Sequence, residues 1–201
     1  MEKNIIYKAI FFIGLFTSGT LNAQLLDSAG IADKAIFYSM EEALQNPMEV
    51  FKLSLKKQKL SQVPDLNPFP NLQWLDLSRN KLKEVPEEIG ALINLQYLDM
   101  SKNQIDLIPK EIGKLVNLKQ LYLNQNNIAY LPPQIGKLIN LEILDLWDNE
   151  ITDFPETMKE IKSLKKLDLR NILITDKEQK RISNLLPGTK IYFSQGCNCA
   201  H

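Results

Sequence analysis

The chain has 201 residues, of which 24 are basic and 24 are acidic, so its formal net charge is zero. A chain without net charge has no long-range field to attract nucleic acid or an anionic membrane surface, and neither is expected as a partner. The only cysteines are Cys197 and Cys199, at the end of the chain, so no disulfide framework holds the body of the fold together.

The first 23 residues are typical of a secretory signal peptide. Lys3 and Lys8 flank the start of an apolar stretch, roughly residues 9–16, and small and polar residues then lead to Ala23. A membrane anchor is the alternative, but this stretch is much shorter than the roughly 20 residues that span a bilayer. We therefore expect cleavage near Ala23, export to the periplasm or beyond, and no membrane insertion after cleavage.

A helix signature precedes the central part of the chain. Ser39 and Glu42 have the S-x-x-E spacing of a capping box, which predicts a short helix that ends near Gln45.

The central part is a repeat of 23 residues with its leucines in fixed register. Copies start at Leu72, Leu95, Leu118, Leu141 and Leu164, and a more divergent copy starts at Val50. Each opens with an L-x-x-L-x-L pattern whose alternation predicts a strand. Periods of this size indicate a solenoid, in which each unit buries its apolar face only against its neighbours.

Polar and special residues recur at fixed places in each copy. An asparagine after the strand can bond the backbone of the turn, so we predict a structural ladder of Asn80, Asn103, Asn126 and Asn149. A proline such as Pro86 suits the first position of a short helical turn. Ile89, Ile112, Ile135 and Met158 are expected to fill the core from the helical side. The glycines after the three isoleucines are expected to permit a tight bend: Gly90, Gly113 and Gly136.

A second cap follows the repeats. Thr175 and Glu178 form another capping box, the following helix ends at Pro187, and residues 191–193 predict a strand that covers the sheet edge. We expect a signal peptide (1–23), an N-terminal cap with a short helix (24–49), the 23-residue repeats (50–171), a C-terminal cap of helix and strand (172–193) and a cysteine-containing tail (194–201).

The repeat L-x-x-L-x-L-x-x-N-x-L-x-x-[VIL]-P-x-x-I-G-x-L resembles the leucine-rich repeat family over about residues 50–193. It resembles the 23-residue form found in Ras-suppressor-like and Scribble-like proteins and in many bacterial proteins, and we expect an exported bacterial member. The resemblance implies an α/β solenoid with a parallel sheet on its concave face and short helices or 3-10 turns on its convex face. It also implies binding of other proteins and no common enzymatic activity. Gln58 and Ile172 depart from the asparagine position, as capping repeats do.

The outward side chains of such a sheet form columns, with strands about 4.8 Å apart. Trp74 and Tyr97 are predicted lateral neighbours, and Tyr122, Ile143 and Trp147 form a second apolar group. A column of aspartates runs beside them, balanced by Arg79, Lys102 and Arg170. The candidate partner-binding residues are Trp74, Asp76, Tyr97, Asp99, Tyr122, Ile143, Asp145, Trp147, Asp168 and Arg170.

Exposed aromatic residues on a rigid surface are typical of protein-binding hot spots. Two other interpretations remain: the rings lie over neighbouring strands without a binding role, or they stack on sugars while the aspartates bond hydroxyls. Calcium binding is disfavoured because ligands in one line cannot surround an ion.

Catalysis is not expected. The only histidine is His201, the last residue, so no nucleophile–histidine pair can form inside the solenoid, and no phosphate-binding glycine loop is present. Cys197, Cys199 and His201 could ligate a soft metal, oxidise to a disulfide, or have no role. The sequence predicts a non-catalytic protein-binding module without a cofactor. The alternatives are a carbohydrate-binding protein and a structural protein with a metal- or redox-active tail.

Overall fold

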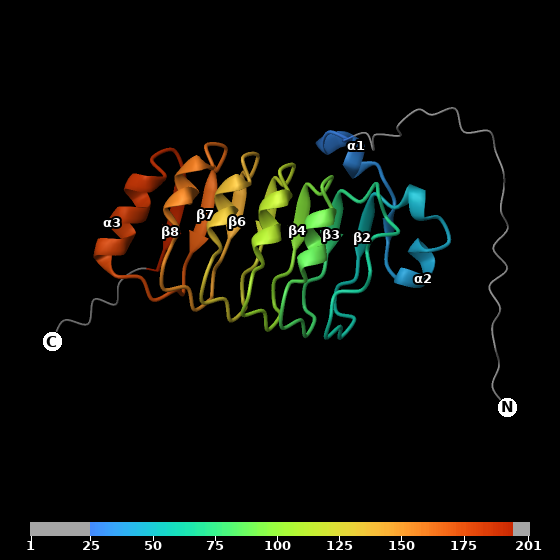
Figure 1. The fold of residues 1–201 in the computed structure, drawn as a ribbon, viewed down its shortest axis with the longest axis horizontal. Helices are drawn as coiled ribbons and strands as arrows, with labels where there is room; N and C mark the ends of the chain where they lie inside the picture. Colours follow the sequence, from blue (N-terminus) through green and yellow to red (C-terminus); the bar gives the residue numbers. More distant parts are fainter. Residues whose placement is uncertain (1–24, 195–201) are drawn as a thin grey trace.

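The computed structural model describes residues 25–194, and the predicted signal peptide and the cysteine-containing tail lie outside this range. Eight parallel strands form one open sheet in chain order, β1 to β8, so each coil adds one strand beside the last (Figure 1). The predicted solenoid with a parallel sheet is confirmed. The strands are β1 (Ile36–Phe37), β2 (Lys52–Ser54), β3 (Trp74–Asp76), β4 (Tyr97–Asp99), β5 (Gln120–Tyr122), β6 (Ile143–Asp145), β7 (Lys166–Leu169) and β8 (Lys190–Phe193).

Helical segments follow one another along the solenoid and also stand at its two ends (Figure 1). No helix within residues 25–194 has the length and apolar character needed to cross a bilayer. The α-helices are α1 (Ser28–Ala32), α2 (Met40–Ala43) and α3 (Asp176–Leu185), and the 3-10 helices are η1 (Pro47–Glu49), η2 (Glu87–Ala91), η3 (Lys110–Lys114), η4 (Pro133–Lys137) and η5 (Glu156–Glu160).

The core is the set of inward leucines that the repeat predicts. Leu75, Leu98, Leu121 and Leu144 are fully buried and face one another in register across β3 to β6. Ile89, Ile112, Ile135 and Met158 are also buried, from the helical side. Burial of a leucine contributes about 1.5–3 kcal/mol, so this shared interior is the main stabilising feature of the solenoid.

The ladder asparagines join neighbouring coils. The side-chain amide of Asn126 donates to the carbonyl oxygens of Leu123 (2.8 Å) and Met100 (3.1 Å), and its Oδ1 accepts the backbone N–H of Ile105 (3.0 Å). Each amide therefore bonds both its own turn and the preceding coil. The same pattern occurs at Asn80, Asn103 and Asn149.

Two features of the turns did not emerge from the sequence. The residue before each ladder asparagine has a left-handed backbone, with φ between 57° and 60°, at Arg79, Lys102, Gln125 and Asp148. A second set of asparagines stands before each strand; for example, Asn117 donates to the carbonyl of Ile93 (2.8 Å). Its other members are Asn71, Asn94 and Asn140, and their spacing of 23 residues was a readable signal.

The expected bend at the glycines is wrong. Gly90, Gly113 and Gly136 lie inside 3-10 helices, and no described glycine has a positive φ. The reason for glycine is instead the close approach of the next coil. A Cβ at Gly113 would lie 2.6 Å from the carbonyl oxygen of Gln134. The prolines also lie one residue earlier than predicted. Pro86 and its three later counterparts stand directly before the first 3-10 residue instead of occupying it.

Both caps contain the predicted elements. Ser39 Oγ accepts the N–H of Glu42 at 3.1 Å and starts α2, and Thr175 Oγ1 accepts the N–H of Glu178 at 3.3 Å and starts α3. Strand β8 covers β7, as expected. The divergent Gln58 of the first copy donates to the carbonyl of Tyr38 (2.6 Å) and so joins the repeats to the N-terminal cap.

Candidate functional site on the concave face

The outward aromatic side chains form one row on the concave face. The rings of Trp74 and Tyr97 are stacked, with centroids 4.8 Å apart and an interplanar angle of 14°. Tyr122 continues the row, with its centroid 5.4 Å from that of Tyr97 and a tilt of 43°. The structure therefore places Tyr122 with Trp74 and Tyr97, whereas the sequence had grouped it with Ile143 and Trp147. All five side chains are half-buried.

The orientation of these rings bears on the carbohydrate interpretation. Sugar recognition by stacking needs an aromatic ring with an open face. Trp74 and Tyr97 cover one face of each other, and Tyr122 leans over the other side of Tyr97. These contacts cover part of the ring faces that a stacked sugar would need.

The aspartates beside the row have a structural task that the sequence did not reveal. In each case Oδ1 accepts the backbone N–H two residues later, in a turn that ends the strand. The distances are 2.8 Å for Asp76, 2.9 Å for Asp99, 3.1 Å for Asp145 and 3.3 Å for Asp168. Each aspartate of the column therefore stabilises the turn at the end of its strand.

Within residues 25–194, only the aspartates at the two ends of this column, Asp76 and Asp168, form ion pairs. Lys56 lies 3.5 Å from Asp76, and Arg170 makes a two-pronged contact with Asp168 at 2.7 and 2.9 Å. The expectation that Arg79 and Lys102 balance the aspartates is wrong: within residues 25–194 neither forms an ion pair with them. Both residues occupy the left-handed turn positions and are exposed.

The pKa shifts also differ between an aspartate that has an ion pair and those that have none. Burial raises the pKa of Asp99 and of Asp145. Burial would also raise the pKa of Asp168, but the hydrogen bonds and positive charge of Arg170 outweigh it and hold that pKa below its usual value. The pKa of Tyr97 is raised well above its usual value by burial and by the negative charges of Asp99 and Asp76.

Helix α1 lies near β2 and β3 (Figure 1), and its residues form a wall beside Trp74 and Tyr97. The backbone N–H of Leu26 donates to Gln73 Oε1 (3.0 Å), and Gln96 Nε2 donates to the carbonyl of Leu26 (2.7 Å). Lys52 Nζ donates to the carbonyl of Ala32 at 3.4 Å. Between wall and row lies a cavity of about 360 Å³ whose lining includes Ile31, Ala32, Ile36, Trp74 and Tyr97.

The sequence missed this wall. Leu26 and Gln73 are 47 residues apart, and only the folded chain brings them together. The available signal was a pair of polar residues, Gln73 and Gln96, at the same register position beside strands; both are buried.

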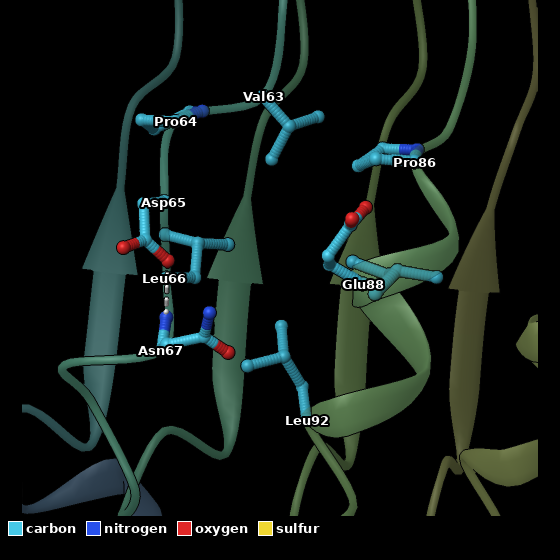
Figure 2. A pocket seen from close by; sticks show the side chains of 9 residues that line it. Val63, Pro64, Asp65, Leu66, Asn67, Pro86, Glu88 and Leu92 are labelled. Carbon is cyan, nitrogen blue, oxygen red and sulfur yellow. Dashed lines mark hydrogen bonds between the residues drawn. The ribbon is translucent and has the colours of Figure 1, made fainter.

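A second cavity, of about 370 Å³, lies on the convex side (Figure 2). The chain forms no helix between β2 and β3, so the coil before η2 supplies no 3-10 helix to pack beside it. Glu88 is therefore exposed, whereas its counterpart Glu111 is 9% exposed beside η2. The cavity has an apolar floor that includes Leu66 and Leu92 and belongs to the end of the helix stack.

The candidates in the tail, Cys197, Cys199 and His201, lie outside the described residues. Among residues 25–194, no three side chains of the metal-ligating types come together.

The comparisons with known proteins agree with this architecture. The sequence pattern of the leucine-rich repeat region family matches residues 48–187. A leucine-rich repeat protein of Leptospira interrogans is 33% identical, with a TM-score of 0.66, over 79% of this chain and 46% of that one. None of the curated proteins is significantly similar to this chain.

Two further solved structures are similar in fold. One is the ectodomain of the plant receptor kinase GASSHO1/SCHENGEN3 of Arabidopsis thaliana, in complex with CASPARIAN STRIP INTEGRITY FACTOR 2, at 25% identity and a TM-score of 0.65 over 80% of this chain and 20% of that one. The other is internalin C2 of Listeria monocytogenes, at 23% identity and a TM-score of 0.65 over 78% of this chain and 66% of that one. The chain thus spans less than half of the Leptospira protein.

Leucine-rich repeat solenoids commonly serve as protein-interaction modules and are typically non-catalytic. The match of the family pattern over most of the chain, the asparagine ladder and the parallel sheet all lead to one assignment. This chain belongs to the leucine-rich repeat family.

Proposed function

We propose that this protein is a non-catalytic module that binds a segment of a partner protein across the concave face. The supporting observation is the half-exposed row of Trp74, Tyr97 and Tyr122 beside the cavity under α1. The proposed contact residues are Trp74, Asp76, Tyr97, Asp99, Tyr122, Ile143, Asp145, Trp147, Asp168 and Arg170.

The physical basis is a rigid apolar surface. Stacked rings on hydrogen-bonded strands have already lost most of their side-chain freedom, so their burial by a partner costs little further entropy. The solved complex of the Arabidopsis ectodomain with CASPARIAN STRIP INTEGRITY FACTOR 2 supports a protein partner for a fold of this kind.

We further propose that residues 1–23 are a signal peptide cleaved near Ala23 and that the protein acts outside the cytoplasm. The division into caps at 24–49 and 172–193, repeats at 50–171 and a tail at 194–201 is part of this proposal. Mass spectrometry of the protein from the extracellular or periplasmic fraction should show a chain that begins at Gln24. A chain that still begins at Met1 would contradict the assignment.

Affinity purification with mass spectrometry tests the concave site. The wild type should recover a partner that the triple variant Trp74→Ala, Tyr97→Ala, Trp147→Ala loses. The control variant carries Ile93→Ala, Val116→Ala and Ile139→Ala, which remove exposed apolar side chains outside the strands. Thermal unfolding must show that both variants are folded. Equal recovery by all three proteins would refute the site.

A further inference from the structure

The middle of the concave face holds two carboxylates that form no ion pair within residues 25–194. The outward side chains of strands β4 to β6 include Asp99 and Asp145 but no lysine or arginine. Lys102, in the turn after β4, is exposed and forms no ion pair with either aspartate. The cations that contact side chains of this face lie at its ends: Lys56 with Asp76, Arg170 with Asp168, and Lys166 over the ring of Tyr192. Lys119, directly before β5, lines the cavity under α1. Within residues 25–194, no cationic group lies within ion-pair distance of Asp99 or Asp145.

These two carboxylates flank the aromatic row. Tyr122 on β5 pairs in register with Asp99 on β4 and with Asp145 on β6. Each carboxylate uses Oδ1 for a backbone N–H, from Ser101 and Trp147 respectively, and Asp99 also forms hydrogen bonds with the side chains of Ser101 and Tyr97. An ionised carboxylate has about four lone-pair sites, so both retain capacity to accept charged donors.

Partial burial without a counter-ion is costly, and a cation from outside would offset this cost. Burial raises the pKa of both carboxyl groups and outweighs the more distant positive charges of Lys56 at Asp99 and of Lys166 and Arg170 at Asp145. A guanidinium or ammonium group that arrives beside Tyr122 would supply the missing charge and charge-assisted hydrogen bonds.

We infer that the partner segment is basic and places two cationic side chains against Asp99 and Asp145, on either side of Tyr122. This inference rests on the proposed function, because it names the chemistry of the partner at the same surface. Strands about 4.8 Å apart put the two carboxylates about 10 Å apart. A polyproline II segment, which rises about 3.1 Å per residue, places residues three apart on one side at about 9 Å. The best fit is therefore a pair of arginines or lysines three residues apart.

Synthetic peptides test the inference directly. Each peptide has the same neutral background and carries two arginines two, three or four residues apart, or two citrullines in the same places. Citrulline keeps the shape of arginine and removes its charge. We expect the arginine peptide with the three-residue spacing to bind wild-type protein about tenfold or more tighter than its citrulline counterpart, with the preference falling as salt is added.

The variants separate this inference from the proposed function. Asp99→Asn with Asp145→Asn keeps an oxygen for each backbone N–H and should abolish the arginine preference. The matched control, Glu87→Gln with Glu160→Gln, removes two exposed charges from the helical side and should keep it. Equal binding of arginine and citrulline peptides, or an unchanged preference in the aspartate variant, would overturn the inference. The purification with the aromatic variant reports independently on the proposed function.

Discussion

At the residue scale, the aspartates of the concave face have different surroundings despite equivalent places in the repeat. Asp168 is paired with Arg170, whereas Asp145 has no such partner among the described residues. A carboxyl group with a lowered folded-state pKa stabilises the fold above its unfolded pKa, and this contribution is lost as pH falls through the folded pKa. A raised pKa has the opposite effect, because protonation then favours the folded state.

The pH dependence of two variants should therefore differ in sign. Asp168→Asn should destabilise the protein at pH 7, and its difference from wild type should vanish in acid, below the lowered pKa of Asp168. Asp145→Asn should be neutral or stabilising at pH 7, and that gain should shrink as pH falls through the raised pKa of Asp145. Urea unfolding at a series of pH values measures both. The same pH profile for the two variants would contradict the assignment.

The asparagine ladder gives a second prediction at this scale. Asn126→Ala leaves the carbonyls of Leu123 and Met100 and the N–H of Ile105 without their partner, and should lower the free energy of unfolding by about 1–3 kcal/mol. Asn127 is exposed, so Asn127→Ala should change it by no more than about 0.5 kcal/mol. Denaturant unfolding compares them, and equal effects would show that the ladder bonds contribute little.

At the scale of the element, the 3-10 helices stack because their glycines allow backbone contact. The carbonyl of Gln134 lies where a side chain on Gly113 would start, and the carbonyl of Thr157 does the same at Gly136. The glycine therefore sets the distance between coils. Its φ is not positive, so its backbone conformation does not itself require glycine.

Gly113→Ala should destabilise the protein by about 1–3 kcal/mol through overpacking, because the neighbouring atom is backbone and cannot turn aside. Gly188→Ala is the control, since a Cβ there meets nothing within 4 Å. It should be neutral or stabilise by up to about 1 kcal/mol. Thermal unfolding of the two variants checks this. A neutral Gly113→Ala would mean that the coils can move apart at little cost.

At the scale of the whole molecule, the solenoid depends on its ends. Arg181 of α3 holds the C-terminal cap: it donates to the carbonyl of Phe154 (2.6 Å) and to Glu178 (2.6 Å) and also contacts Glu156. In a repeat protein each coil contacts only its neighbours, so loss of a cap should loosen the nearest coils first.

Arg181→Ala should therefore speed amide hydrogen exchange in β7 and β8 and leave β4 nearly unchanged. Lys180→Ala, beside it and exposed, is the control. The overall loss of stability should be about 1–3 kcal/mol, the cost of unpaired hydrogen-bonding groups. Uniformly faster exchange along the chain would show instead that the solenoid opens as one unit.

The local periodicity of the sequence was enough to predict the core, the sheet and the outward columns. Side chains alternate across a strand, and a repeat of constant length puts equivalent residues such as Leu98 and Leu121 side by side. The same reasoning predicted the lateral contact of Trp74 with Tyr97. The helix starts at Ser39 and Thr175 were equally readable, because a capping box is a contact between residues three apart.

Only the tertiary structure decided how segments outside this periodicity are placed. The wall formed by α1 depends on contacts between Leu26 and glutamines far along the chain. The ion pairs of Asp76 and Asp168 depend on which lysine or arginine reaches them, and the role of Gly113 depends on the distance between two coils. Such distances arise from packing between segments that are remote in sequence, and no local pattern encodes them.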